Sequence, residues 1–254
     1  MGALIAGALG EFSPATFAFA LAAVFLAAIL RGFTGFGFAL MAVPALALVL
    51  PPAEVVPCTL LMPLVAGLDT LRKAWRQADW PSLKPLLLGA LAVTPVGVYV
   101  LSILPVAFMR ASIGIIVLLA ALLFWRGPHL KLAPSRLFSL GVGGLSGFLT
   151  GGTAMGGPPV ILYYMALPAG LAVGRASLFV FFTCTSIATV AVQAAGGLIT
   201  ARALVVAALL LPAVIIGNTL GDRGFDRAGA PTYRRVALGS LVVAGAAALL
   251  RAFF

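Results

Sequence analysis

The stretch GFLTGGTAMGGPP, from Gly147 to Pro159, interrupts apolar sequence with a concentration of glycine and proline. A second interruption of the same kind, RGFTGFGFALMAVP, extends from Arg31 to Pro44. Glycine lowers the preference of the backbone for a helix, and proline removes a donor and clashes with the preceding helical turn. Each stretch therefore predicts a helix that is broken inside an apolar segment.

The sequence around these interruptions is typical of a membrane protein. Of its 254 residues, 63% are hydrophobic and 9% are charged, and it divides readily into runs on the scale of a spanning helix. A backbone that is broken at membrane depth is tolerated where protein or a water-filled cavity satisfies its polar groups. The composition therefore predicts an all-α polytopic membrane protein whose surroundings are the lipid bilayer.

The apolar runs repeat in two halves with the same order of elements. A shift of 119 residues places Gly32 on Gly151, Thr34 on Thr153 and Gly37 on Gly156. Each half is predicted to contain a broken or re-entrant helix pair followed by three spanning helices. The first repeat is expected at 1–126, with its broken pair at 31–44, and the second at 137–254, with its broken pair at 147–159. A cytoplasmic linker at 127–136 joins them.

Helix boundaries follow from the places where apolar runs meet glycine, proline or charge. We expect helices to leave the two breaks near Phe36–Ala39 and near Gly157–Val160. Loops are expected at Arg72–Arg76 and at Asp222–Arg235, followed by a last helix at Val236–Leu250.

The net charge of +10 is explained by membrane orientation. The basic residues lie in short loops between apolar runs and do not form the clustered face that nucleic-acid binding needs, so nucleic acid is not an expected partner. By the positive-inside rule, the loops around Arg72–Lys84 and Asp222–Arg235 are predicted to face the cytoplasm. Both termini are then predicted outside, and the two halves enter the membrane from opposite sides, as an inverted repeat requires.

Three stretches of the chain resemble the sulfite exporter TauE/SafE family of membrane transporters. They are RGFTGFGFALMAVPAL at 31–46, GGTAMGGPPVILYY at 151–164 and VGRASLFVFF at 173–182. The second stretch departs from the family pattern at Thr153, Ala154 and Met155, where a further glycine is often found. The resemblance implies a multi-pass permease of the bacterial inner membrane. It also implies a small sulfur-containing anion as cargo, such as sulfite or a sulfonate.

The residues at the breaks are suited to an anion independently of that resemblance. Helix N-termini offer unpaired N–H groups and a partial positive charge, and paired breaks near the midplane are where transporters hold their substrates. Alternatively, the glycines only permit close helix crossing, and the two arginines are anchors at the membrane interface. The candidate substrate-binding residues are Arg31, Gly32, Thr34, Gly35, Phe36, Gly37, Thr153, Gly156, Gly157, Pro158 and Arg175.

The sequence therefore predicts a membrane transporter for a small sulfur oxyanion. A passive anion channel, or a transporter of another small organic anion, is the alternative. An enzyme is not expected, because no nucleophile–base pair is visible and His129 lies in the polar linker; no cofactor or metal is expected either. Asp69 precedes Arg72 by three residues, so it forms a local ion pair or else has a part in gating or proton transfer. A homodimer is left open.

Overall fold

The computed structural model describes residues 13–126, 135–168 and 170–227, and the regular structure in these ranges is helical. Four helices there are long and apolar enough to cross a membrane: α2 (Pro14–Thr34), α6 (Trp80–Ile103), α10 (Leu171–Ala195) and α11 (Ala201–Arg227). A bent pair, α4 (Pro52–Ala66) and α5 (Leu68–Gln77), would make a fifth span. The prediction of an all-α polytopic membrane protein is thus confirmed. Outside the described ranges lie residues 127–134 of the predicted linker (127–136), the expected last helix and both termini. Arg136, the last residue of that predicted linker, instead begins a helix.

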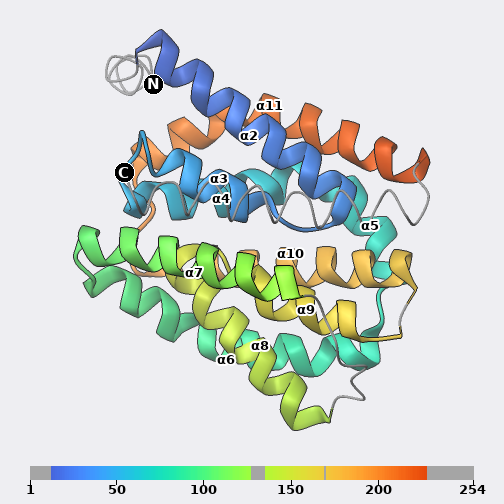
Figure 1. Ribbon diagram of the computed structural model, residues 1–254. Coiled ribbons are helices and arrows are strands. Elements are labelled where there is room, and N and C mark those ends of the chain that lie inside the picture. The colour runs from blue at the N-terminus through green and yellow to red at the C-terminus, as the bar shows by residue number, and fades with distance from the viewer. Residues whose placement is uncertain (1–12, 127–134, 169, 228–254) are drawn as a thin grey trace.

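The helices form three layers (Figure 1). Helices α2 and α11 pack together on one side of the molecule, and α6 packs with α8 (Arg136–Thr153) on the opposite side. Between them lie α3 (Phe38–Leu46), α4, α9 (Gly157–Ala166) and α10. Helix α7 (Val106–Arg126) follows α6 by a tight turn at Pro105. The two outer pairs each join one helix of the first half to one helix of the second half.

Helix boundaries in the two halves correspond. Helix α3 begins at Phe38 and α9 at Gly157, which lie within the predicted ranges and are 119 residues apart. Helices α4 and α10 begin at Pro52 and Leu171, again 119 residues apart. After each break the chain turns back, α3 toward the left of the view and α9 toward the right (Figure 1). These correspondences are what a repeat predicts, and the inverted relation of the halves stays a prediction.

Glycines bring the outer helix pairs into backbone contact. A Cβ atom added at Gly143 or Gly147 of α8 would overlap a main-chain carbonyl of α6. On the opposite side, a Cβ at Gly32 of α2 would overlap the carbonyl of Asn218, and one at Gly221 would overlap that of Ile29. Helices in a membrane associate by such close packing, since small residues let their backbones approach.

The structure differs from the sequence prediction in three segments. Arg72–Arg76 lies in α5 and Asp222–Arg227 lies in α11, although both were expected to be loops. Charge alone does not end a helix: in α5, Thr70 and Ala74 are buried while the basic side chains lie exposed on the other face. Helix α8 also continues to Thr153, because its glycines pack against α6 and do not break the helix.

Basic residues gather at one end of the bundle, on the right in Figure 1. This end contains α5, the starts of α6, α8 and α10, and the end of α11. The basic residues in these segments are Arg72, Lys73, Arg76, Lys84, Arg136, Arg175, Arg223 and Arg227. At the opposite end, Arg110 lies near the start of α7 and Arg202 near the start of α11.

Candidate binding site at the two helix breaks

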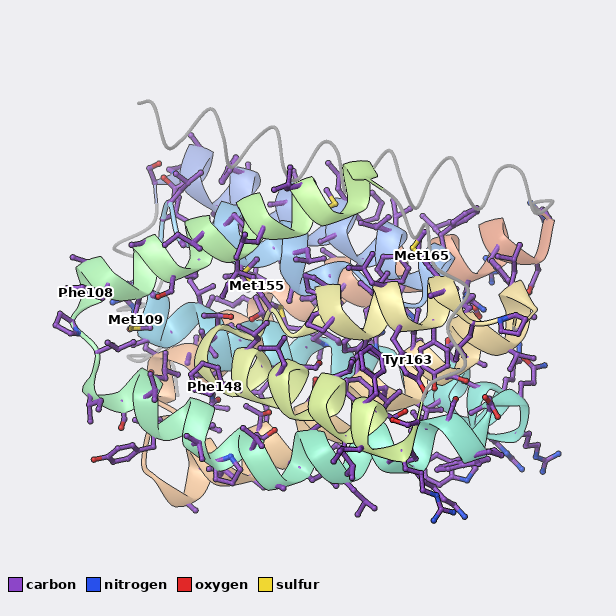
Figure 2. All side chains as sticks on the ribbon, turned by 60° about the horizontal axis from the view of Figure 1, so that its bottom comes forward. Phe108, Met109, Phe148, Met155, Tyr163 and Met165 are labelled. Atoms are coloured by element: carbon purple, nitrogen blue, oxygen red, sulfur yellow. The ribbon has the colours of Figure 1, made fainter. Side chains whose placement is uncertain are left out.

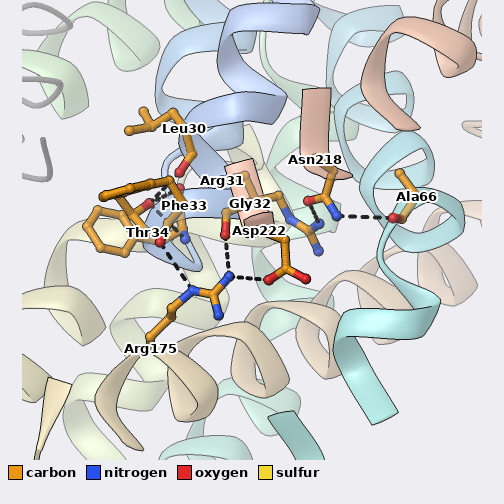
Figure 3. Close-up of polar contacts among 10 residues, drawn as sticks. Leu30, Arg31, Gly32, Phe33, Thr34, Ala66, Arg175, Asn218 and Asp222 are labelled. Atoms are coloured by element: carbon orange, nitrogen blue, oxygen red, sulfur yellow. Dashed lines mark hydrogen bonds and ion pairs between the residues drawn. The ribbon is translucent and has the colours of Figure 1, made fainter. Parts of the chain in front are cut away.

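The first break is closed by two glycines and a threonine. Helix α2 ends at Thr34, and Gly35 and Gly37 take left-handed conformations with φ of 83° and 91°, which glycine adopts without strain. The Thr34 hydroxyl donates to the carbonyl of Leu30 at 2.8 Å and accepts from the N–H of Phe36 at 3.3 Å (Figure 3). These bonds satisfy main-chain groups that the helix end would otherwise leave unpaired.

The second break has the same local geometry at an offset of 119 residues. Ala154 corresponds to Gly35 and also has a positive φ, 60°. The Thr153 hydroxyl donates to the carbonyl of Leu149 at 2.8 Å and accepts from the N–H of Met155 at 3.3 Å. Thr34 and Thr153 are therefore equivalent, and both hydroxyls bond to their own main chain.

The two breaks line one cavity of about 60 Å³, to which α4 and α10 also contribute. The break segments therefore meet inside the bundle although they are far apart in the sequence. Five of the predicted site residues line this cavity: Arg31, Gly35, Phe36, Gly37 and Gly157. The other six lie outside its walls: Gly32, Thr34, Thr153, Gly156, Pro158 and Arg175.

The predicted residues that lie outside the cavity have structural contacts. Gly32 packs against α11, as described above. A Cβ at Gly156 would overlap the hydroxyl of Thr150 and the carbonyl of Ser146, so this glycine is required for the break to pack against α8. Pro158 is buried in the first turn of α9, where the absence of an N–H has little cost.

Several residues that line the cavity were not among the predicted site residues. Thr59 of α4, Thr150 of α8 and Thr183 and Ser186 of α10 add hydroxyl groups. The hydroxyls of the three threonines donate to carbonyls of their own helices. One signal for Thr150 was available in the sequence, because the offset of 119 residues places it on Arg31.

Arg31 is the charged side chain of the cavity wall as the structure describes it, and it is only 5% exposed. Its Nη1 donates to Oδ1 of Asn218 at 3.0 Å, and Asn218 in turn donates to the carbonyl of Ala66 at 3.2 Å (Figure 3). The guanidinium also lies over the ring of Phe179, 4.3 Å from its centre. Gly67 leaves room for this pair, since an added Cβ would lie 3.0 Å from Nη2 of Arg31.

The positive charge of Arg31 needs a counter-charge, because its guanidinium is buried. Among the side chains that the structure describes, no carboxylate forms an ion pair with Arg31, and the side chain of Asp69 is not one of those described. A buried charge without a partner is costly, so an anion inside the cavity would stabilise the guanidinium. The first turn of α3 also lines the cavity, and the first N–H groups of a helix have no partner within the helix itself.

Arg175 is bonded differently. Its Nε donates to the carbonyl of Phe33 at 3.1 Å, and its Nη2 donates to the carbonyl of Gly32 and to Asp222 (Figure 3). The guanidinium also lies over the ring of Phe225. Arg175 therefore caps the C-terminal end of α2 and connects it to α11.

A second cavity, of about 190 Å³, lies at the basic end of the bundle. Its charged lining is balanced, with Lys73 and Arg175 against Asp222 and Asp226. Phe179 also lines this cavity, so the ring that contacts Arg31 lies between the second cavity and the wall of the first.

Comparison with known proteins gives two matches. The family model of the sulfite exporter TauE/SafE family matches residues 20–248. A protein of Cupriavidus necator named probable sulfite/organosulfonate exporter TauE is 31% identical over 230 residues, which cover 86% of this chain and 88% of that protein. No solved structure matches the chain.

Proposed function

The chain belongs to the sulfite exporter TauE/SafE family, and we propose that it exports a small sulfur-containing oxyanion through the cavity between its two helix breaks. Family membership makes it a multi-pass membrane transporter, not an enzyme. Sulfite and organosulfonates are the cargo named for the relative from Cupriavidus necator. We extend this cargo class to the present chain and place the bound anion in the cavity between the two helix breaks.

The buried guanidinium of Arg31 is the observation that carries the proposal. It lines the cavity and has five N–H donors, of which one bonds to Asn218 among the residues that the structure describes. An oxyanion with two or more oxygens would accept from the remaining donors in the paired geometry that arginine favours. The N-terminus of α3 would contribute main-chain N–H groups from a second direction.

The second cavity is the proposed access route from the cytoplasm. Its lining residues lie at the basic end, which the positive-inside rule assigns to the cytoplasmic side of a bacterial inner membrane. Its balanced charges would hold water without trapping an anion. The anion would then pass Phe179 to reach Arg31. In this arrangement the two halves are inverted repeats, and the breaks meet near the midplane, where transporters of this construction bind their substrates.

The test is transport of labelled sulfite by the purified protein in proteoliposomes. We expect saturable flux in the wild type. Arg31→Gln should raise KM roughly ten- to a hundredfold, since a hydrogen bond to a charged group contributes about 1.5–3 kcal/mol. Arg31→Lys should be intermediate, because lysine keeps the charge and loses the planar fork. Arg136→Gln, the same change at an exposed position of α8, is the matched control and should leave KM unchanged.

Three outcomes would contradict the proposal. Flux that rises linearly with concentration would indicate a passive channel. Transport of a different organic anion without any response to sulfite or sulfonates would change the cargo. A normal KM in a correctly folded Arg31→Gln variant would remove the anion from this cavity.

A further inference from the structure

The side chain of Gln193 in α10 is buried without a hydrogen bond. It is fully buried, and neither its Nε2 nor its Oε1 has a partner among the residues that the structure describes. Most buried polar side chains are bonded, because an unpaired group loses its bonds to water without replacing them. Thr189, one turn earlier and equally buried, follows this rule, since its hydroxyl donates to the carbonyl of Thr185 at 2.7 Å. A second conformation that gives the amide of Gln193 partners would therefore remove a cost.

Gln193 lies between the central cavity and the end of the bundle opposite the basic residues. Ser186 of α10 lines the cavity, and Gln193 follows it by seven residues, on the same face and roughly 10 Å further along the helix. Figure 2 shows Met155 of the cavity wall between Met109, at this end, and Tyr163, toward the basic end. Because Met109 is buried, the described side chains close this end. An anion that moved from the cavity to this end would pass the face of α10 that carries Gln193.

The helix that corresponds to α10 in the first half is bent. The offset of 119 residues places α10 on residues 52–76, which form α4 and α5, with Ser186 on Gly67 and Gln193 on Ala74. Helices α4 and α5 are bent by 82° at the break that contains Gly67, whereas α10 is one continuous helix (Figure 1). Two equivalent segments thus have different conformations in one structure.

The bent segment lines the proposed access route. Ala74 of α5 lies in the wall of the second cavity, at the basic end. If the halves are inverted repeats, the same bend in α10 would open the opposite end, and Gln193 would occupy there the position that Ala74 has in the access route. Straightening of α4 and α5 would close the basic end in the same step.

The bend is connected to the residue that is proposed to bind the anion. The carbonyl of Ala66, the last residue of α4, accepts from Asn218 at 3.2 Å, and Asn218 accepts from Arg31 at 3.0 Å. An anion that takes donors of Arg31 would compete with this chain of bonds. Occupation of the cavity would therefore favour release of the bend.

We infer that α10 bends at Ser186 when the transporter opens to the side opposite its basic end, and that Gln193 then lines the exit path and donates its amide N–H to the departing anion. The inference rests on the proposed function and adds the route by which the cargo leaves. In the closed conformation Gln193 is unpaired, and in the open conformation the anion or water would supply its partners.

Gln193→Leu separates this role from a structural one. The substitution removes the unpaired groups, so the midpoint of thermal unfolding should rise by a few degrees. With sulfite supplied to proteoliposomes on the side of the basic end, the turnover number should fall roughly tenfold, while KM should not increase. Thr94→Val is the matched control: it removes a buried hydroxyl of α6 that is bonded to the carbonyl of Ala90 at 2.7 Å. It should leave turnover unchanged and should not raise the midpoint.

Hydrogen–deuterium exchange of the wild type in lipid nanodiscs tests the bend directly. A helix that bends at Ser186 leaves the amides of residues 187–190 without their partners four residues earlier. We expect faster exchange there than in residues 176–185 of the same helix, and slower exchange there in Gln193→Leu. Uniform protection along α10 would overturn the bend. Wild-type turnover in Gln193→Leu, or a lower midpoint together with lower turnover, would overturn the role of Gln193. Absence of sulfite transport by the wild type would instead overturn the proposed function itself.

Discussion

Two arginines lie close to the first break, and their surroundings give them different tasks. Arg31 lines the cavity and has no described carboxylate partner, whereas Arg175 is held by main-chain carbonyls of α2 and by Asp222. Arginine at membrane depth is often functional, but one that satisfies a helix end has a structural role. These contacts therefore separate Arg31, the proposed ligand of the anion, from Arg175, which holds the end of α2 in position.

Arg175→Gln is expected to lower stability and to leave anion affinity nearly unchanged. The substitution removes the ion pair to Asp222 and leaves the carbonyls of Gly32 and Phe33 with weaker partners, at a cost of about 1–3 kcal/mol. Thermal unfolding of the detergent-solubilised protein would measure this loss, and KM for sulfite should remain close to the wild-type value. A KM raised as in Arg31→Gln, with no loss of stability, would make Arg175 a ligand.

Among the elements, the two outer helix pairs depend on glycine at their contacts. Helix α8 offers a matched comparison between neighbouring glycines of the same helix. A Cβ at Gly143 would overlap the carbonyl of Leu86 in α6, whereas a Cβ at Gly141 would have nothing within 4 Å. The close approach of α6 and α8 therefore requires a residue without a Cβ atom at Gly143 and places no such requirement on Gly141.

Gly143→Ala should destabilise the protein by about 1–3 kcal/mol, because the extra methyl group forces two packed backbones apart. Gly141→Ala should be neutral or stabilising by roughly 0.5–1 kcal/mol, since alanine is the better helix former. The midpoint of thermal unfolding, measured for both variants in the same detergent, provides the comparison. Equal midpoints would show that the pair is held by other contacts.

The sequence located the breaks well because glycine and proline act locally. It could not assign each glycine to a task, since a close helix contact and a close ligand contact both require the absence of a Cβ. Gly32 illustrates this, because its partner, Asn218, is far away in the sequence and is found only once α2 and α11 are packed. Likewise, Thr34 and Thr153 are visible as equivalent residues, but whether a hydroxyl bonds to its own helix or to a ligand depends on coordinates.

At the scale of the whole molecule, the distribution of charge gives the bundle two distinct ends. The basic residues of α5, α6, α8, α10 and α11 lie together at one end, although they come from both halves of the chain. Segments predicted as separate loops are thus brought to one side by the fold. The positive-inside rule predicts that this side faces the cytoplasm, and the same orientation is required if the second cavity is the entry for an exported anion.

Membrane orientation is tested with single cysteines in a background in which Cys58 and Cys184, the two native cysteines, are replaced by alanine. Arg76→Cys in α5 and Arg227→Cys in α11 are exposed at the basic end, and Ser102→Cys is exposed at the opposite end. In intact cells whose outer membrane is permeable to the reagent, an impermeant maleimide should label Ser102→Cys at once. It should label Arg76→Cys and Arg227→Cys only after the inner membrane is opened, because a sulfonated maleimide cannot cross the hydrocarbon core. Labelling in the reverse order would place the basic end outside, and the larger cavity would then be an exit and not an entry.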